Sequence, residues 1–116
     1  MGKLSRDKGA RIEREIVALH RKIGIAAERV PLSGGSAYQG NMEDIDVYPF
    51  GLDEAPFCCQ VKGMKTPRGC KGVIDALGEA DALFMRFDAP PGGQVAPPIV
   101  VMPWATYERL IKRGRI

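Results

Sequence analysis

A chain of 116 residues, of which 45% are hydrophobic and 27% charged, has the size and composition of one globular domain. Its formal net charge of +3 is too small to indicate nucleic-acid binding by itself. No apolar run approaches the roughly 18 residues of a membrane span, and the N-terminus is polar and basic. We therefore expect a single cytoplasmic domain over residues 1–116, without a membrane as partner.

The hydrophobic pattern predicts an α/β domain with a mixed sheet flanked by helices. Ile12, Ile16 and Leu19 recur at helical spacing and predict an amphipathic first helix. Short apolar runs bounded by glycine and proline predict strands, and in the second helix we expect Ile74 and Leu77 to face inward. The elements, in the order α-β-β-β-α-β-β-α, are expected over residues 5–22, 25–30, 44–50, 57–63, 71–80, 82–87, 99–102 and 104–112.

The three cysteines favour neither a disulfide framework nor a zinc site. Their number is odd, Cys58 and Cys59 face opposite sides of a predicted strand, and Cys70 has no partner at metal-binding spacing. Reduced cysteines, with Cys59 in the core, are the simpler interpretation.

Two strand segments carry the clearest chemical signal. Because residues two apart share a face of a strand, Asp44 and Asp46 point one way, and Gln60 and Lys62 share a face of the next strand. If the segments pair as a hairpin, carboxylates, an amide oxygen and an ammonium group converge. Oxygen ligands suit Mg²⁺ or Mn²⁺, and a lysine can orient the attacking water. The pattern therefore predicts metal-assisted phosphodiester hydrolysis.

Two further groups of residues are candidates for contact with a nucleic-acid backbone. Ser33, Gly34, Gly35 and Ser36 form a flexible polar loop, whose glycines let the backbone approach phosphates closely. Basic side chains near the two strands can add salt-dependent affinity for phosphates. These residues are Arg29, Lys65, Arg68 and Lys71. A plain connector and a solvated basic turn are the alternative interpretations.

Four segments, taken in order, resemble the Holliday junction resolvases of archaea and their phage-type relatives, within the PD-(D/E)XK, restriction-endonuclease-like superfamily. The match extends from about residue 8 to residue 62, and the remainder agrees in element order more than in specific residues. The segments are Lys8-Gly9-Ala10-Arg11-Ile12-Glu13-Arg14-Glu15-Ile16, Arg29-Val30-Pro31-Leu32-Ser33-Gly34-Gly35-Ser36, Asp44-Ile45-Asp46-Val47 and Gln60-Val61-Lys62.

The resemblance implies a restriction-endonuclease-like mixed sheet, an active site where two central strands diverge, two divalent metals and a homodimer that cuts branched DNA during recombination. By position, Glu13 matches the acid on the helix, Asp44 the first strand acid and Lys62 the motif lysine. The Ser33–Ser36 segment resembles a loop near the scissile phosphate.

The chain departs from the family at Gln60, which occupies the place usually held by glutamate. A glutamine amide oxygen can ligate Mg²⁺, but it is neutral, so metal affinity should fall. Asp46, on the same face as Asp44, is a candidate for compensation, whereas Glu43 starts on the opposite face and is a poorer one. The substitution is compatible with a working enzyme that needs more metal and with a degenerate one.

The first hypothesis is an Mg²⁺-dependent endodeoxyribonuclease of the junction-resolvase type, acting as a homodimer. Asp44, Gln60 and the Val61 carbonyl would hold one metal, Glu13 and Asp46 would help to place a second, and Lys62 would orient the water. The alternatives are the same chemistry on flaps or linear duplex, a DNA-binding module that has lost cleavage, and an interaction subunit that docks through its last strands and C-terminal helix.

Overall fold

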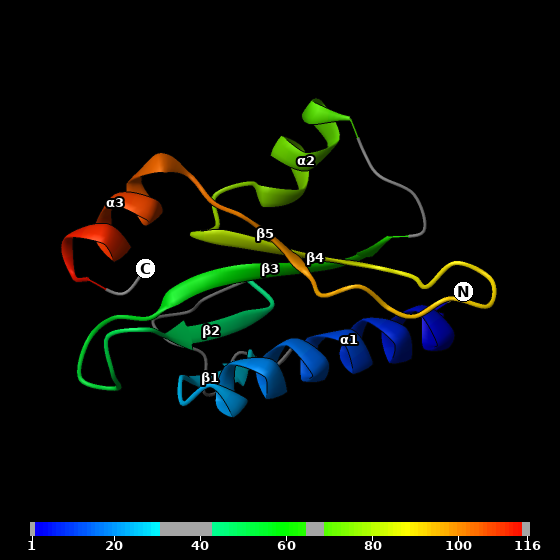
Figure 1. Cartoon of the computed structure of the whole chain (residues 1–116), viewed down its shortest axis with the longest axis horizontal. Helices are drawn as coiled ribbons and strands as arrows, with labels where there is room; N and C mark the ends of the chain where they lie inside the picture. Colours follow the sequence, from blue (N-terminus) through cyan, green and yellow to red (C-terminus); the bar gives the residue numbers. More distant parts are fainter. Residues whose placement is uncertain (1, 31–42, 65–68, 115–116) are drawn as a thin grey trace.

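The computed structural model describes residues 2–30, 43–64 and 69–114 of the chain, and its elements follow the predicted order (Figure 1). Helix α3 and strand β4 have the predicted bounds. The elements are α1 (Gly2–Lys22), β1 (Ala26–Arg29), β2 (Ile45–Tyr48), β3 (Phe57–Met64), α2 (Cys70–Leu77), β4 (Ala82–Phe87), β5 (Ile99–Val101) and α3 (Trp104–Lys112). None of the helices in the described ranges is long and apolar enough to cross a membrane.

The five strands form one mixed sheet in the order β1-β2-β3-β4-β5. Strands β3 and β4 are parallel, with α2 in the connection between them, and the other neighbouring pairs are antiparallel. Strands β2 and β3 pair as the predicted hairpin, with Ile45 opposite Cys59 and Asp46 opposite Cys58. The α/β class with a mixed sheet and flanking helices is confirmed, and the arrangement is consistent with a restriction-endonuclease-like fold.

Helix α1 forms because its apolar residues recur on one side and its C-terminus is well capped. Ile12, Ile16 and Val17 are buried against the sheet. Gly24 has φ of +83°, and the N–H of Ile25 donates to the carbonyl of His20 at 2.9 Å. This left-handed glycine closes the helix and turns the chain back into β1.

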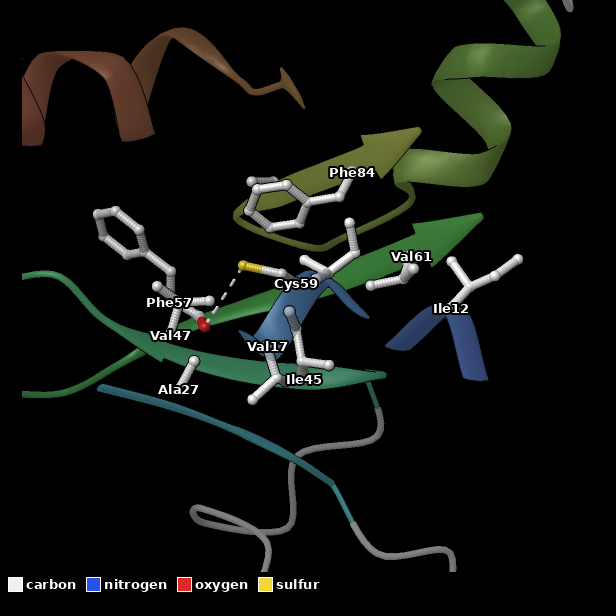
Figure 2. Close-up of a cluster of buried hydrophobic side chains, with 11 residues drawn as sticks. Ile12, Val17, Ala27, Ile45, Val47, Phe57, Cys59, Val61 and Phe84 are labelled. Carbon is white, nitrogen blue, oxygen red and sulfur yellow. Dashed lines mark hydrogen bonds between the residues drawn. The ribbon is translucent and has the colours of Figure 1, made fainter. Parts of the chain in front are cut away.

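The main core lies between α1 and one face of the sheet (Figure 2). Side chains of β2, β3 and β4 that point to this face are almost fully buried, and Leu110 of α3 packs against the same cluster. Cys59 is 1% exposed, as predicted, and burial is the main cause that raises its pKa well above the ordinary value. The cysteine at position 59 is therefore a core residue and not a reactive thiol.

The opposite face of the sheet is covered by α2, whose inward residues differ in part from the prediction. Val73 and Leu77 pack against Met64, Leu83 and neighbouring side chains of β3 and β4, so the inward orientation of Leu77 is confirmed. The prediction for Ile74 is wrong, because its side chain is 66% exposed. Val73, Ala76 and Leu77, at i, i+3 and i+4, form the side that contacts the sheet, and Ile74 lies about 100° around the helix axis from Val73.

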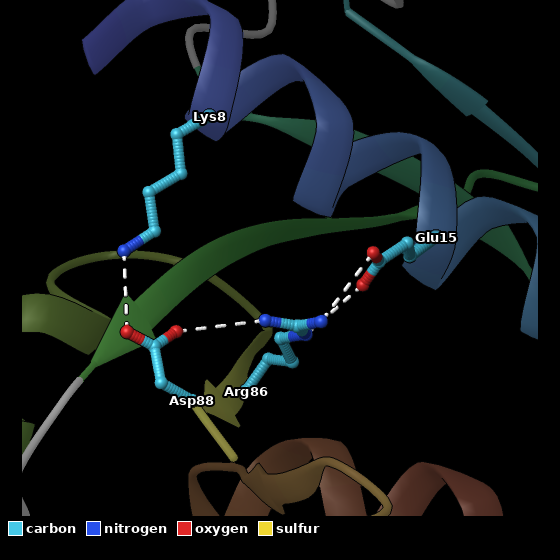
Figure 3. A network of polar contacts seen from close by, with 4 residues as sticks. All are labelled: Lys8, Glu15, Arg86 and Asp88. Atoms are coloured by element: carbon cyan, nitrogen blue, oxygen red, sulfur yellow. Dashed lines mark hydrogen bonds and ion pairs between the residues drawn. The ribbon is translucent and has the colours of Figure 1, made fainter. Parts of the chain in front are cut away.

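An ion-pair network joins Lys8 and Glu15 of α1 to the end of β4 (Figure 3). Arg86, whose side chain is 14% exposed, lies between Glu15 at 3.0 Å and Asp88 at 3.6 Å, and Lys8 contacts Asp88 at 3.4 Å. Because Arg86 of β4 and Asp88 just after it both contact charged side chains of α1, this network helps to fix how α1 lies along the sheet.

Gly63 of β3 lets α1 approach the sheet beside the predicted site. A Cβ atom at position 63 would occupy the space taken by the Cδ1 atom of the buried Ile12 side chain. Ile12 immediately precedes Glu13, so the close approach also positions that carboxylate.

Replacing Gly63 with alanine is expected to lower the free energy of unfolding by about 1–2 kcal/mol, because Ile12 must move within a packed core. Chemical denaturation would measure the loss. Gly69→Ala is the matched control, since no atom lies within 4 Å of a Cβ built there. Equal stability of the two variants would show that Gly63 is not needed for close packing of α1.

Candidate active site

The hydrogen-bond ladder between β2 and β3 ends at Asp44, just before β2 begins. The backbone N–H of Asp44 donates to the carbonyl of Cys59 at 2.9 Å. The next available donor on β3, the N–H of Val61, donates at 2.8 Å to Oδ2 of the Asp44 carboxylate and not to backbone. The Asp44 side chain therefore lies where the two strands diverge.

This contact fixes the orientation of the Asp44 carboxylate relative to β3. Because the N–H and C=O of a strand residue point to the same side, the carbonyl of Val61 faces the same divergence as its N–H. Asp44 and the Val61 carbonyl thus offer two oxygen donors toward one region, as required of the predicted ligands.

Gln60 lies next to this point, and its side chain contacts Glu43. Its Nε2 donates to Oε1 of Glu43 at 2.6 Å. The expectation that Glu43 would point away is wrong, because β2 begins at Ile45 and Glu43 and Asp44 lie in a bend, where the alternation of a strand does not apply. In the sequence, the adjacency of Glu43 and Asp44 directly before a strand was the signal that both carboxylates could lie near Gln60.

Glu13 approaches the site from α1. Oε1 of Glu13 accepts a hydrogen bond from Nε of Arg29 at 3.1 Å, and the Glu13 side chain is 19% exposed. Burial raises the pKa of Glu13, the Arg29 hydrogen bond opposes this effect, and the negative charge of Asp44 raises the pKa further. The structure thus brings Glu13 into the electrostatic range of Asp44, from the α1 side of the sheet.

The negative charges of the carboxylates at the site act on one another, and the charge of Asp44 raises the pKa of both Glu13 and Glu43. Burial and then the Asp44 charge raise the pKa of Glu43, while the hydrogen bond from Gln60 lowers it. In the described ranges no three His, Cys, Asp or Glu side chains form a ready metal cluster. The donors at the divergence are nevertheless all oxygen atoms, counting the Gln60 amide and the Val61 carbonyl. This donor set fits a hard divalent cation.

Lys62 is exposed on β3, two residues beyond Gln60 and therefore on the same face. Within the part of the chain that the structure describes, its ammonium group makes no hydrogen bond or ion pair. The lysine is available to a substrate that approaches the strand divergence.

Asp46 lies further along β2, away from Lys62. It is 1% exposed and is opposite Cys58 in the ladder. Burial raises the pKa of Cys58 to about 11, and the neighbouring Asp46 carboxylate raises it as well. The hairpin register thus places Asp46 against Cys58, two residues beyond Asp44 along the chain.

A basic groove of about 350 Å³ lies beside Glu13. Arg14 and Arg21 of α1 line it together with Arg29 of β1, the predicted phosphate contact. Arg21 also donates to the carbonyl of Ala27 at 2.9 Å. Sequence reasoning missed the two α1 arginines, although their spacing of seven residues places them on one side of a helix.

The remaining predicted DNA contacts are separated from this groove or lie outside the described residues. Lys71 is exposed on α2, across the sheet from α1, and pairs with Asp75 at 2.9 Å (Figure 1). The other predicted contacts, namely Ser33, Gly34, Gly35, Ser36, Lys65 and Arg68, lie outside the residues that the structure describes.

Comparisons with curated proteins and with solved structures gave no significant match. A family model does match the N-terminal part of the chain. The matched region carries Glu13, Arg29 and Asp44 and stops before Gln60 and Lys62. The family is the archaeal Holliday junction resolvase, matched over residues 4–48, and this confirms the resemblance of the chain to a resolvase-like nuclease.

Proposed function

We propose that this protein is a divalent-metal-dependent endodeoxyribonuclease that cuts branched DNA, as a Holliday junction resolvase does. The observation that carries the proposal is the Asp44 carboxylate, held by the Val61 N–H where β2 and β3 diverge. Gln60 and Lys62 follow on the adjoining strand, at the spacing of the motif. The family match over residues 4–48 supports nuclease chemistry.

The residues at the divergence have separable roles in this proposal. Asp44, the Gln60 amide oxygen and the Val61 carbonyl would hold Mg²⁺ or Mn²⁺, with Glu13 assisting from α1. A bound cation would supply charge neutralisation at the scissile phosphate and a more acidic water. Lys62 would orient the attacking water and stabilise the charge that develops on the phosphate.

The flanking surface would bind the DNA backbone. Arg14, Arg21 and Arg29 form a basic groove next to Glu13. Such a groove attracts phosphates without reading sequence. Strands of a duplex that pass along it would approach Asp44 from the side of α1.

We further propose that the protein acts as a homodimer, so that two sites can cut opposite strands of a junction. Ile99 and Val100 of the edge strand β5 are 53% and 45% exposed, and Trp104 of α3 is 71% exposed. An apolar surface of this kind supports a protein contact, and a solution size measurement with and without DNA would test it.

A DNA-binding module without cleavage is the second candidate. The observation that favours it is the hydrogen bond from Gln60 to Glu43, which uses the motif side chain as a donor to a carboxylate. Binding to a junction would then persist through the basic groove while cleavage is absent.

Cleavage of a synthetic four-way junction, beside a flap and a linear duplex of matched sequence, tests the proposal in Mg²⁺ and in Mn²⁺. Paired, symmetric nicks on the junction are expected, with slower cutting of the other substrates. Preferred cutting of the flap or the duplex would reassign the substrate, and junction binding without any cutting would support the second candidate.

Restoring the family carboxylate by Gln60→Glu is expected to shift cleavage to lower Mg²⁺, by about 10-fold in concentration. Without metal, the new carboxylate lies beside Glu43, so we expect a loss of about 1–2 kcal/mol of stability near neutral pH. The repulsion raises the folded-state pKa of the pair, so the loss should shrink as the pH falls toward 5. Thermal melts with and without Mg²⁺ measure both effects, and an unchanged Mg²⁺ requirement would contradict a ligand role for position 60.

A further inference from the structure

The substitution at position 60 leaves the proposed site one carboxylate short, and the structure indicates which residue replaces it. Resting on the proposed metal-dependent function, we propose that Glu43 is a metal ligand in this chain and that Gln60 orients it. Glu43, in the bend before β2, would thus supply the carboxylate that the family usually has on β3 at the position of Gln60.

The contact between Glu43 and Gln60 supports this exchange of roles. Oε1 of Glu43 lies 2.6 Å from Nε2 of Gln60, so the carboxylate occupies the immediate neighbourhood of the side chain that usually bears the charge. Glu43 directly precedes Asp44, whose carboxylate lies on the N–H of the residue after Gln60. Two consecutive acids therefore flank the same short stretch of β3.

The number of carboxylate charges also supports Glu43 as a ligand. A site with aspartate and glutamate on neighbouring strands carries two negative charges, and Asp44 with Glu43 also carries two. Hard cations are held mainly by carboxylate charge, so the count matters more than the strand from which it comes. Asp46 is a weaker substitute, because it is 1% exposed and opposite Cys58 in the ladder.

Gln60 has a defined function in this arrangement. Its amide N–H holds the Glu43 carboxylate at the strand divergence, in the way that outer hydrogen bonds commonly orient metal ligands. Gln60 is thus a positioning residue for Glu43, whether or not its own oxygen reaches the cation.

Isothermal titration of the 116-residue protein with Mn²⁺ tests the proposal without depending on cleavage. Glu43→Gln is expected to weaken Mn²⁺ binding by about 10-fold or more, because one ligand charge is removed. Glu79→Gln is the matched control, since Glu79 is exposed and close enough for its charge to act on Glu43. If Glu43 binds the cation directly, Glu79→Gln should keep the Mn²⁺ affinity within about 2-fold of that of the original protein. A similar loss in both variants would instead indicate a general effect of negative charge.

The double variant Glu43→Gln, Gln60→Glu exchanges the two side chains and keeps both the charge count and a possible hydrogen bond. It is expected to regain Mn²⁺ affinity to within about 3-fold of the original protein. Circular dichroism of the single variant Glu43→Gln checks directly that it is folded.

The outcomes separate failure of this inference from failure of the proposed function. If the original protein binds Mn²⁺ and Glu43→Gln binds it equally well, Glu43 is not a ligand, while the metal-dependent function stands. Equal weakening by Glu43→Gln and Glu79→Gln would also overturn the inference. If the original protein binds no Mn²⁺, the metal-dependent function fails and this inference fails with it.

Discussion

Lys62→Ala is expected to slow junction cleavage by about 100-fold or more, because an ammonium group that stabilises developing charge contributes on this scale. The fold should not change, since Lys62 is exposed and its ammonium group has no hydrogen bond or ion pair within the described residues. We therefore expect a melting temperature within about 2 °C of the original protein.

Single-turnover cleavage of a labelled four-way junction measures this effect, with junction affinity determined in parallel. Lys112→Ala is a suitable control, because Lys112 is an exposed lysine on α3 that pairs only with Glu108 of its own helix among the described residues. If Lys62→Ala and Lys112→Ala both cleave as fast as the original protein, Lys62 has no part in the reaction. Equal loss in both would indicate a general effect of positive charge on DNA binding.

Substitution of Asp44 should separate the chemical role of this carboxylate from its structural role. Asp44→Asn is expected to abolish cleavage, a loss of at least about 1,000-fold, because the central ligand loses its charge. The asparagine oxygen can still accept the hydrogen bond from the Val61 N–H, so stability should change by less than about 1 kcal/mol. Asp44→Ala removes both functions and should cost about 1–3 kcal/mol in addition to activity.

Denaturation curves and cleavage rates of the two Asp44 variants give the comparison. Cleavage retained by Asp44→Asn would contradict the need for a charged ligand at position 44. Equal stability of the asparagine and alanine variants would show that the hydrogen bond to Val61, 2.8 Å long, contributes little to the fold.

The order of helices and strands could be predicted because local patterns decide it. Glycine and proline bound the apolar runs of β4 and β5, and Ile12 and Ile16 mark the buried side of α1. Ile74 was placed wrongly because the side of α2 that packs on the sheet is centred on Val73, Ala76 and Leu77, and Ile74 lies outside it.

The site was predictable only where its residues lie within regular strands. Alternation correctly paired Gln60 with Lys62, which both belong to β3. The same reasoning failed for Glu43, because β2 begins two residues later and side chains in a bend do not alternate between two faces. The approach of Glu13 to Asp44 depends on the fit of Ile12 over Gly63, a long-range contact that no local pattern reveals.

The most direct test of a metal-dependent site at this divergence is the rate of four-way junction nicking as a function of Mg²⁺ concentration, for the original protein and for Asp44→Asn. We predict symmetric nicks that rise with Mg²⁺ and that vanish in Asp44→Asn while junction binding persists. Nicking that needs no divalent cation, or that Asp44→Asn retains, would contradict a metal-dependent site at the divergence of β2 and β3.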